Sequence, residues 1–238
     1  MPDAGSIPYK LICPECAREF DSTLVQTFCQ DCQSPILARY DLEALRASLD
    51  PVDIANRPRG MWRWHELLPV RDPRCRVTLG EGDTPLLPAP RLGARLGLRR
   101  LLIKDESINP TGTFKARGMA AAISKAVELG VRDFVIPTAG NAGGALAGYA
   151  SRCGCRAHVY MPQDTPAPIK YEVKMAGADL HLVQGTISDA ARRAREDAAG
   201  KPWFDLSTFR EPFRVEGKKI MGYELAEALG WQLRDVII

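Results

Sequence analysis

From about residue 100 onward, short apolar runs alternate with longer segments of helix-favouring composition, and this alternation restricts the fold more than any other feature. The apolar runs have the length of β-strands and lie at 101–103, 134–136, 157–161, 180–183 and 236–238. The segments between them predict helices over about 113–129, 142–152, 166–176, 188–199 and 216–229, each followed by a glycine. This spacing predicts βαβ units, and therefore an α/β fold whose parallel sheet is covered by helices on both faces.

The apolar run at 236–238 has the character of a buried strand, and it coincides with the end of the chain. In α/β folds the ligand-binding loops follow the carboxyl ends of such strands. We therefore expect this sequence to be a fragment of a longer protein.

The composition divides the chain into three parts. Residues 1–40 contain four of the seven cysteines without helical periodicity, so we expect a small separate module. Residues 41–95 hold one short helical signal followed by repeated prolines, which predicts an extended connector that wraps the larger part. Residues 96–238 carry the alternating α/β pattern.

Charge and hydropathy exclude several classes of partner. The 32 basic and 29 acidic residues leave a net charge of +3, too small and too scattered for a nucleic-acid footprint. The longest apolar runs stop far short of the roughly 18 residues that a membrane span needs. The first ten residues lack the basic-then-apolar order of a secretory signal. We expect a cytoplasmic protein that binds neither nucleic acid nor membrane.

The cysteines predict a structural zinc site in the N-terminal module. Cys13 and Cys16 form one C-x2-C pair, and Cys29 and Cys32 form a second pair after twelve intervening residues. Four thiolates at this spacing can surround one Zn²⁺ and leave no open position for catalysis. Two disulfides or four unconnected thiols are the alternatives. A nucleic-acid-binding ribbon is disfavoured, because the segment 17–28 contains one arginine and no lysine.

A loop with proline and glycine at 109–112 opens an alanine-rich helix, with Thr113 as the expected N-cap and Lys115 in the first turn. The positive end of the helix dipole disfavours an ammonium group there, and burial beside Phe114 and Met119 would act in the same direction. Lys115 is thus a candidate nucleophilic amine. A solvated lysine at a helix start is the alternative.

The segment 137–144 directly follows the apolar run at 134–136 and consists mostly of small residues. A strand, a small-residue turn and a helix present free backbone N–H groups to a carboxylate or phosphate. The G-x-G-x-x-G spacing of dinucleotide sites is absent from it. A turn that serves only tight packing remains the alternative.

Four motifs occur in this order along the chain: Leu79–Leu86, Lys104–Glu106 followed by Asn109–Gly118, Thr138–Gly144 and Arg214–Lys218. Together they resemble the pyridoxal-phosphate enzymes of the tryptophan synthase β fold type and, within them, the threonine synthases. Some threonine synthases also carry a cysteine-rich N-terminal module. The resemblance implies an incomplete fold type II catalytic domain over 96–238, including a smaller substrate-side subdomain at about 125–200, preceded by a zinc ribbon.

The resemblance also implies roles for individual residues. Lys115 would carry the pyridoxal 5'-phosphate and act as the base, Asn141 would hydrogen-bond the 3-oxygen of the cofactor, and Arg214 would bind the substrate phosphate. The amino-acid carboxylate would be held by the turn residues Thr138, Gly140, Asn141 and Ala142. The implied lyase reaction converts O-phosphohomoserine and water to L-threonine and phosphate, with a homodimer as the candidate assembly.

Several positions depart from the threonine synthase pattern. Ala116 stands where an aspartate is usual, Ala139 stands where a hydroxyl residue is common, and 207–212 lacks the expected asparagine and serine positions. A threonine ammonia-lyase or a related β-eliminating lyase is therefore one alternative. A catalytically inactive zinc-ribbon binding protein is another.

Overall fold

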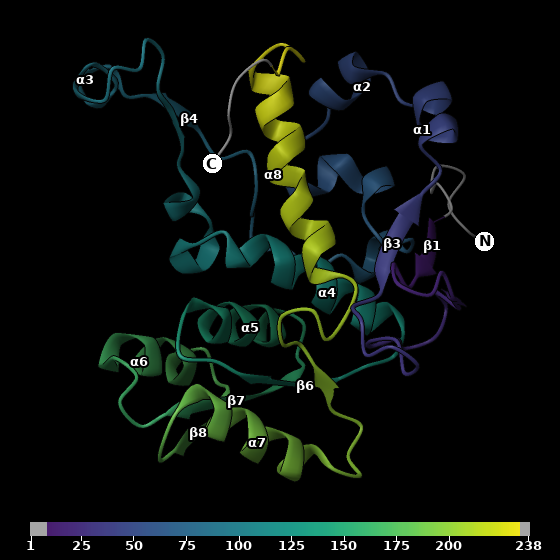
Figure 1. Cartoon of the computed structure of the whole chain (residues 1–238), viewed down its shortest axis with the longest axis vertical. Helices are drawn as coiled ribbons and strands as arrows, with labels where there is room; N and C mark the ends of the chain where they lie inside the picture. Colours follow the sequence, from purple (N-terminus) through teal and green to yellow (C-terminus); the bar gives the residue numbers. More distant parts are fainter. Residues whose placement is uncertain (1–8, 234–238) are drawn as a thin grey trace.

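The computed structural model describes residues 9–233, which form three separate sheets and the helices around them (Figure 1). The strand expected at 236–238 lies outside the described residues. Within residues 9–233, no helix combines the length and the apolar character that crossing a bilayer requires.

The largest sheet has four parallel strands in the order β8-β7-β6-β9. Their bounds are Asp133–Pro137 for β6, Arg156–Pro162 for β7, Asp179–Val183 for β8 and Phe204–Asp205 for β9. The two central strands, β6 and β7, are almost continuously buried, as expected when both faces of a parallel sheet are covered. The predicted α/β class is confirmed.

Helices lie on both faces of this sheet (Figure 1). α5 (Asn141–Arg152) and α6 (Ala167–Met175) cover one face, and α7 (Ile187–Ala198) covers the other. α4 (Lys115–Glu128) packs on α5, and α8 (Arg214–Ala228) packs on α4. All five predicted helices are confirmed to within two residues at each end.

Two glycines bring the backbones of α4 and α8 into contact. A Cβ atom at Gly217 would lie 2.0 Å from the carbonyl oxygen of Arg117, and one at Gly118 would lie 3.0 Å from that of Arg214. Any larger residue at 217 would therefore force the helices apart. This close crossing sets the start of α8 beside the first turn of α4.

The expected strand at 101–103 forms, but its predicted place in the parallel sheet is wrong. β5 (Leu102–Lys104) pairs antiparallel with β4 (Leu86–Pro88) in a separate two-stranded sheet. The reason is that the preceding connector supplies its own extended segment, and an antiparallel partner needs no crossover helix. Two short 3-10 helices, η3 (Glu106–Ile108) and η4 (Pro110–Gly112), then lead into α4.

The N-terminal module is a three-stranded antiparallel sheet in the order β2-β1-β3. Its strands are β1 (Tyr9–Ile12), β2 (Glu19–Phe20) and β3 (Leu37–Tyr40). The connector after it contains short helices: α1 (Leu42–Ser48), α2 (Pro51–Ala55), η1 (Met61–Leu67), η2 (Pro73–Cys75) and α3 (Pro90–Arg95). The module contacts α8, because the Nζ atom of Lys219 lies 3.7 Å from the Tyr40 ring centroid.

Candidate active site

Lys115 is the first residue of α4 and is half-buried. Its Nζ atom lies 3.6 Å from the centroid of the Phe114 ring. Burial lowers the pKa of the Lys115 amine, and the positive charge of Arg214 lowers it further. The cap position is occupied by Phe114 instead of Thr113, although the Thr113 hydroxyl still accepts a hydrogen bond from the Lys115 amide at 3.2 Å. The lysine is thus held in an environment that favours its neutral form.

Two further cations lie near this lysine on the first turns of α8. Arg214 is 4% exposed, and its Nη1 atom donates to the Leu206 carbonyl at 2.6 Å, whereas its buried Nε has no hydrogen-bond partner among residues 9–233. Lys218 lies one turn further, with Nζ 5.7 Å from the same Phe114 ring centroid. Burial lowers the pKa of Lys218, and Arg214 and Lys115 add to this effect. We call Lys115, Arg214 and Lys218 the cation cluster.

Glu211 is a buried acidic residue beside the cation cluster. Its side chain is 4% exposed and accepts hydrogen bonds from the amides of Phe213 at 2.6 Å and Arg214 at 3.1 Å. Burial raises the pKa of Glu211 to about 7, although these bonds and the neighbouring Arg214 and Lys218 oppose the rise. The charges of Arg214 and Lys218 act on this carboxyl group, and Asp205 acts on Arg214. Arg214 with Lys218 beside it gives the site an affinity for anions.

The expected anion-binding turn joins β6 to α5. Thr138 is buried, and its hydroxyl accepts a hydrogen bond from the Gly140 amide at 3.2 Å. No side chain caps the start of α5, so the amides of Asn141 and Ala142 are available to a ligand. A Cβ atom at Gly140 would meet nothing within 4 Å, which leaves open space beside this turn.

The predicted site residues thus fall into two groups on neighbouring helices. Lys115 and Arg214 come together through the crossing of α4 and α8, while Thr138, Gly140, Asn141 and Ala142 share the single turn that opens α5. The two groups lie on helices that touch, because α4, which begins at Lys115, packs directly on α5, which begins at the turn.

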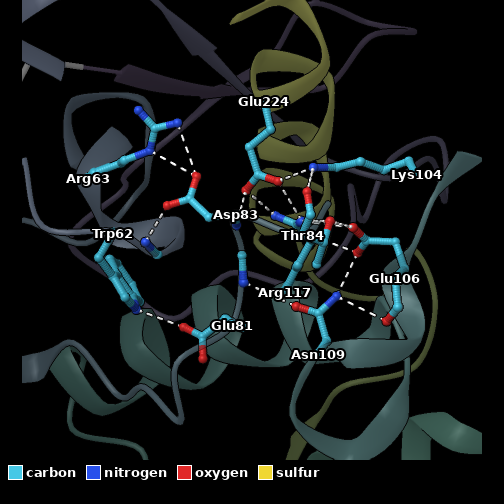
Figure 2. A network of polar contacts seen from close by, with 12 residues as sticks. Trp62, Arg63, Glu81, Asp83, Thr84, Lys104, Glu106, Asn109, Arg117 and Glu224 are labelled. Atoms are coloured by element: carbon cyan, nitrogen blue, oxygen red, sulfur yellow. Dashed lines mark hydrogen bonds and ion pairs between the residues drawn. The ribbon is translucent and has the colours of Figure 1, made fainter. Parts of the chain in front are cut away.

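A buried polar network holds α4, the helix that begins at Lys115, in place. Figure 2 shows Arg117 at the centre of this network, between Glu106 and Glu224. The Arg117 guanidinium group donates to Glu106 at 2.7 Å and 2.8 Å, and to Glu224 twice at 2.7 Å. Lys104 reaches the same Glu224 carboxylate at 2.7 Å. The network therefore joins β5, η3, α4 and α8.

The loop before β4 is tied into this network. The Asp83 amide donates to Glu224 at 2.9 Å, and the Gly82 amide donates to the Asn109 side-chain oxygen at 3.0 Å. Glu81 is fully buried and accepts hydrogen bonds from the Tyr149 hydroxyl at 2.5 Å and the Trp62 indole at 3.0 Å. Segments that are distant in the sequence thus meet around the start of α4.

The four predicted metal-ligating cysteines converge. Their sulfur atoms lie within 4.8 Å of one another, with Cys13 and Cys29 buried and Cys16 and Cys32 exposed. Tetrahedral zinc with Zn–S bonds of about 2.3 Å requires sulfur separations of about 3.8 Å. The separation between Cys16 and Cys29 is 3.8 Å, and that between Cys13 and Cys32 is 3.3 Å. This arrangement is able to hold a metal ion.

Sequence reasoning missed the roles of Arg117, Glu211 and Glu224. A signal was available for the first of these, because an arginine inside an alanine-rich buried helix requires carboxylate partners. The partners themselves are distant in sequence, and Glu224 lies 107 residues from Arg117. Glu211 gave no comparable signal.

Several known proteins are similar to this chain in sequence. The threonine synthase of Methanocaldococcus jannaschii is 34% identical over 95% of this chain and 56% of that relative. The threonine synthase of Synechocystis is 38% identical over 76% of this chain and 48% of that relative. The chain therefore spans about half the length of the curated relatives it matches.

Solved structures support the fold. The apo form of Escherichia coli diaminopropionate ammonia lyase matches with a TM-score of 0.60 at 23% identity, over 65% of this chain and 48% of that chain. Maize serine racemase matches with a TM-score of 0.57 at 23% identity, over 62% of this chain and 45% of that chain.

The family comparison covers the same part of the chain as the site. The model of the family described as "Pyridoxal-phosphate dependent enzyme" matches residues 77–238, well over half of the sequence. This range includes both the cation cluster and the turn at the start of α5. The chain belongs to the pyridoxal-phosphate dependent enzymes.

Proposed function

We propose that this chain carries the lysine-bearing part of a threonine synthase, a lyase that converts O-phosphohomoserine and water to L-threonine and phosphate. The observation that carries the proposal is the cation cluster. Arg214 and Lys218 lie beside the candidate catalytic lysine, where a substrate with a phosphate group would need positive charge. The similarity to threonine synthases over most of the chain supports the same assignment.

The residues present fit pyridoxal phosphate. Lys115 would hold the cofactor covalently, and its lowered pKa supports this because only a neutral amine condenses with an aldehyde. Asn141 is exposed at the start of α5 and would hydrogen-bond the 3-oxygen. When bound, the cofactor acts as an electron sink that stabilises negative charge at the substrate Cα.

The protein itself would bind the substrate and move protons. The amides that open α5 and the Thr138 hydroxyl would bind the amino-acid carboxylate, while Arg214 and Lys218 would bind the phosphate. Lys115 would take the proton from Cα, and a base with a pKa lowered toward neutrality suits this transfer. Asn141 would keep the cofactor oriented.

A second candidate is a threonine ammonia-lyase or a related β-eliminating lyase. The position of Glu211 favours this second candidate. Its carboxyl group already accepts hydrogen bonds from the amides at the start of α8, and while ionised it would repel a dianionic phosphate. A substrate with a neutral hydroxyl group would avoid that repulsion.

Product analysis distinguishes the two candidates. The chain is incubated with pyridoxal phosphate and either O-phosphohomoserine or threonine, with Lys115→Ala as the inactive control. A threonine synthase forms threonine and phosphate in equal amounts from the first substrate. Conversion of threonine to 2-oxobutanoate and ammonia would instead support the lyase, and turnover of neither substrate would show that this chain alone carries out neither reaction.

Substrate binding provides a second test. Arg214→Ala should weaken O-phosphohomoserine binding by about 2–3 kcal/mol, which corresponds to about 30- to 150-fold in affinity. Arg210→Ala is the matched control, because Arg210 is exposed and its guanidinium carbon lies 4.8 Å from the Phe28 ring centroid. Equal losses in both variants would contradict a specific phosphate contact at Arg214.

We also propose that Cys13, Cys16, Cys29 and Cys32 bind one structural Zn²⁺. Support comes from the convergence of their sulfur atoms and from the similar turns around the two pairs. The residue after each pair, Ala17 or Gln33, has a positive φ angle, of 58° and 56° respectively. A cytoplasmic location is consistent with this use, since thiolate metal sites suit a reducing compartment.

A further inference from the structure

Glu211 and Arg214 form an unusual anion subsite at the start of α8. In many proteins the free amides of a helix N-terminus receive the anionic group of a ligand. Here the amides of Phe213 and Arg214 already donate to the chain's own carboxylate at 2.6 Å and 3.1 Å. A ligand anion must therefore be bound by side chains, next to a carboxyl group that cannot move away without breaking these bonds.

The Arg214 guanidinium group has unused capacity for such a ligand. Its Nη1 atom donates to the Leu206 carbonyl, but Nε is buried without a hydrogen-bond partner among the described residues. A buried donor left unpaired is costly, so an acceptor is expected there when the site is filled. Lys218, half-buried on the same side of α8, adds a second positive charge.

Charge balance decides what happens when the anion binds. The charged groups that act on Glu211 are Arg214 and Lys218 from α8, while Asp205 of β9 acts on Arg214, and Lys115 of α4 acts on Lys218. A dianion bound by Arg214 would face an ionised Glu211 in a region shielded from water. The bound dianion and the Glu211 carboxylate cannot both stay negatively charged at such a site without a large electrostatic penalty.

We propose that Glu211 is a proton-accepting residue of the Arg214 subsite, and that it takes up one proton whenever a dianionic group binds there. This inference rests on the proposed function, since it assumes that Arg214 receives a phosphate. Glu211 is 4% exposed, so it has little solvent to screen the incoming charge. Its pKa of about 7 makes protonation accessible at neutral pH.

The coupling also assigns a role to Glu211 in specificity. Ligands with a dianionic group are accepted only together with a proton, whereas ligands with a neutral group leave Glu211 ionised. When product phosphate departs, Glu211 returns its proton to solvent, and the restored negative charge disfavours rebinding of the anion. Glu211 is therefore a positioning residue that acts through Arg214.

Sulfate binding to the chain tests the inference, because sulfate remains dianionic from pH 6 to pH 9 and brings no titration of its own. Affinity is measured by calorimetry across this range. Uptake of one proton predicts that wild-type affinity falls about tenfold per pH unit above the pKa of Glu211. Glu211→Gln should lose this dependence and bind sulfate at least about tenfold more tightly at pH 8.5.

Lys218→Met serves as the matched variant. It should bind sulfate more weakly at every pH but keep the pH dependence, which separates the effect of Glu211 from deprotonation of the lysine. Carboxyl ¹³C NMR of the wild-type chain gives an independent reading that needs no variant. The titration midpoint of Glu211 should rise by at least about one pH unit when sulfate saturates the site.

The outcomes distinguish the inference about Glu211 from the proposed phosphate subsite at Arg214. If sulfate binds, but wild type and Glu211→Gln share one pH dependence and the NMR midpoint does not move, the inference fails and the phosphate subsite stands. If neither sulfate nor inorganic phosphate binds, or if Arg214→Ala binds them as well as wild type does, the subsite is absent. The inference then fails together with the phosphate part of the proposed function.

Discussion

Replacing Arg117 by methionine tests whether the buried network holds the lysine helix in place. Arg117 is 0% exposed and contributes five hydrogen bonds, two to Glu106, two to Glu224 and one to the Thr84 hydroxyl. Methionine fills much of the same volume without a charge. The variant therefore removes the shared cation while leaving both carboxylates in place.

The expected cost follows from what the two carboxylates retain. Glu224 keeps Lys104 at 2.7 Å, whereas Glu106 keeps the neutral donors Thr84 at 2.6 Å and Asn109 at 2.8 Å. Removing one partner from a buried ionic network typically costs about 3–5 kcal/mol. Because one carboxylate still has a cation, we expect a loss of about 3–4 kcal/mol at pH 7.

The loss should depend on pH. Burial alone would raise the pKa values of Glu106 and Glu224. The hydrogen bonds and the charge of Arg117, together with hydrogen bonds from Thr84 to Glu106 and from Lys104 to Glu224, outweigh burial and lower both. In wild type their contribution to stability is present above the unfolded pKa and is lost as pH falls through the folded values. Without Arg117 the two carboxyl groups become easier to protonate, so the difference between variant and wild type should shrink from pH 7 to pH 5.

Urea unfolding followed by tryptophan fluorescence measures both effects, since Trp64 is 1% exposed and reports on core packing. Arg192→Met is the control, because its ion pairs with Asp189 and Glu196 lie on the surface and should contribute less than about 0.5 kcal/mol. An Arg117→Met loss below about 1 kcal/mol, or one that stays constant with pH, would refute the network argument.

Two further predictions concern the helix crossing and the metal site. Gly217→Ala should cost about 3 kcal/mol in urea unfolding, since its Cβ would lie 2.0 Å from a backbone carbonyl oxygen of α4. Gly222→Ala on the same helix should stabilise by about 0.5–1 kcal/mol, because nothing lies within 4 Å of its Cβ, and equal effects of the two changes would argue against the close crossing. The double variant Cys13→Ser/Cys16→Ser should lose the zinc that elemental analysis is expected to find at one ion per wild-type chain, while Cys75→Ser keeps it. Unchanged zinc in the double variant would contradict the four-cysteine site.

Local patterns in the sequence predicted the helices and the central strands well. The helices from 115–128 to 214–228 have a helix-favouring composition and a glycine shortly after their last turn, and both signals are local to each segment. The strand at 102–104 was placed in the wrong sheet, because sheet membership depends on which segment is available as a partner. Here that partner is Leu86–Pro88, a strand that the repeated prolines of the connector did not predict.

The candidate site was only partly predictable for a similar reason. Lys115 and the turn at 138–142 each follow from their position at a helix start, which is a local property. The cation cluster and the pairing of Arg117 with Glu224 arise from the crossing of α4 and α8, which depends on glycines about 100 residues apart in the sequence. A contact between residues so far apart produces no local pattern that can be recognised in a single sequence.

The most direct test of the account is reductive trapping of pyridoxal phosphate on the chain, followed by peptide mass spectrometry. We expect wild type to be labelled at Lys115, and Lys115→Ala to remain folded but to carry no label at position 115. Burial and the charge of Arg214 favour the neutral form of the Lys115 amine. Lys218, whose pKa is also lowered by burial and by Arg214, is the competing amine that the peptide masses distinguish. Labelling confined to Lys218 or spread over surface lysines, with Lys115 unmodified, would contradict the assignment of the catalytic lysine.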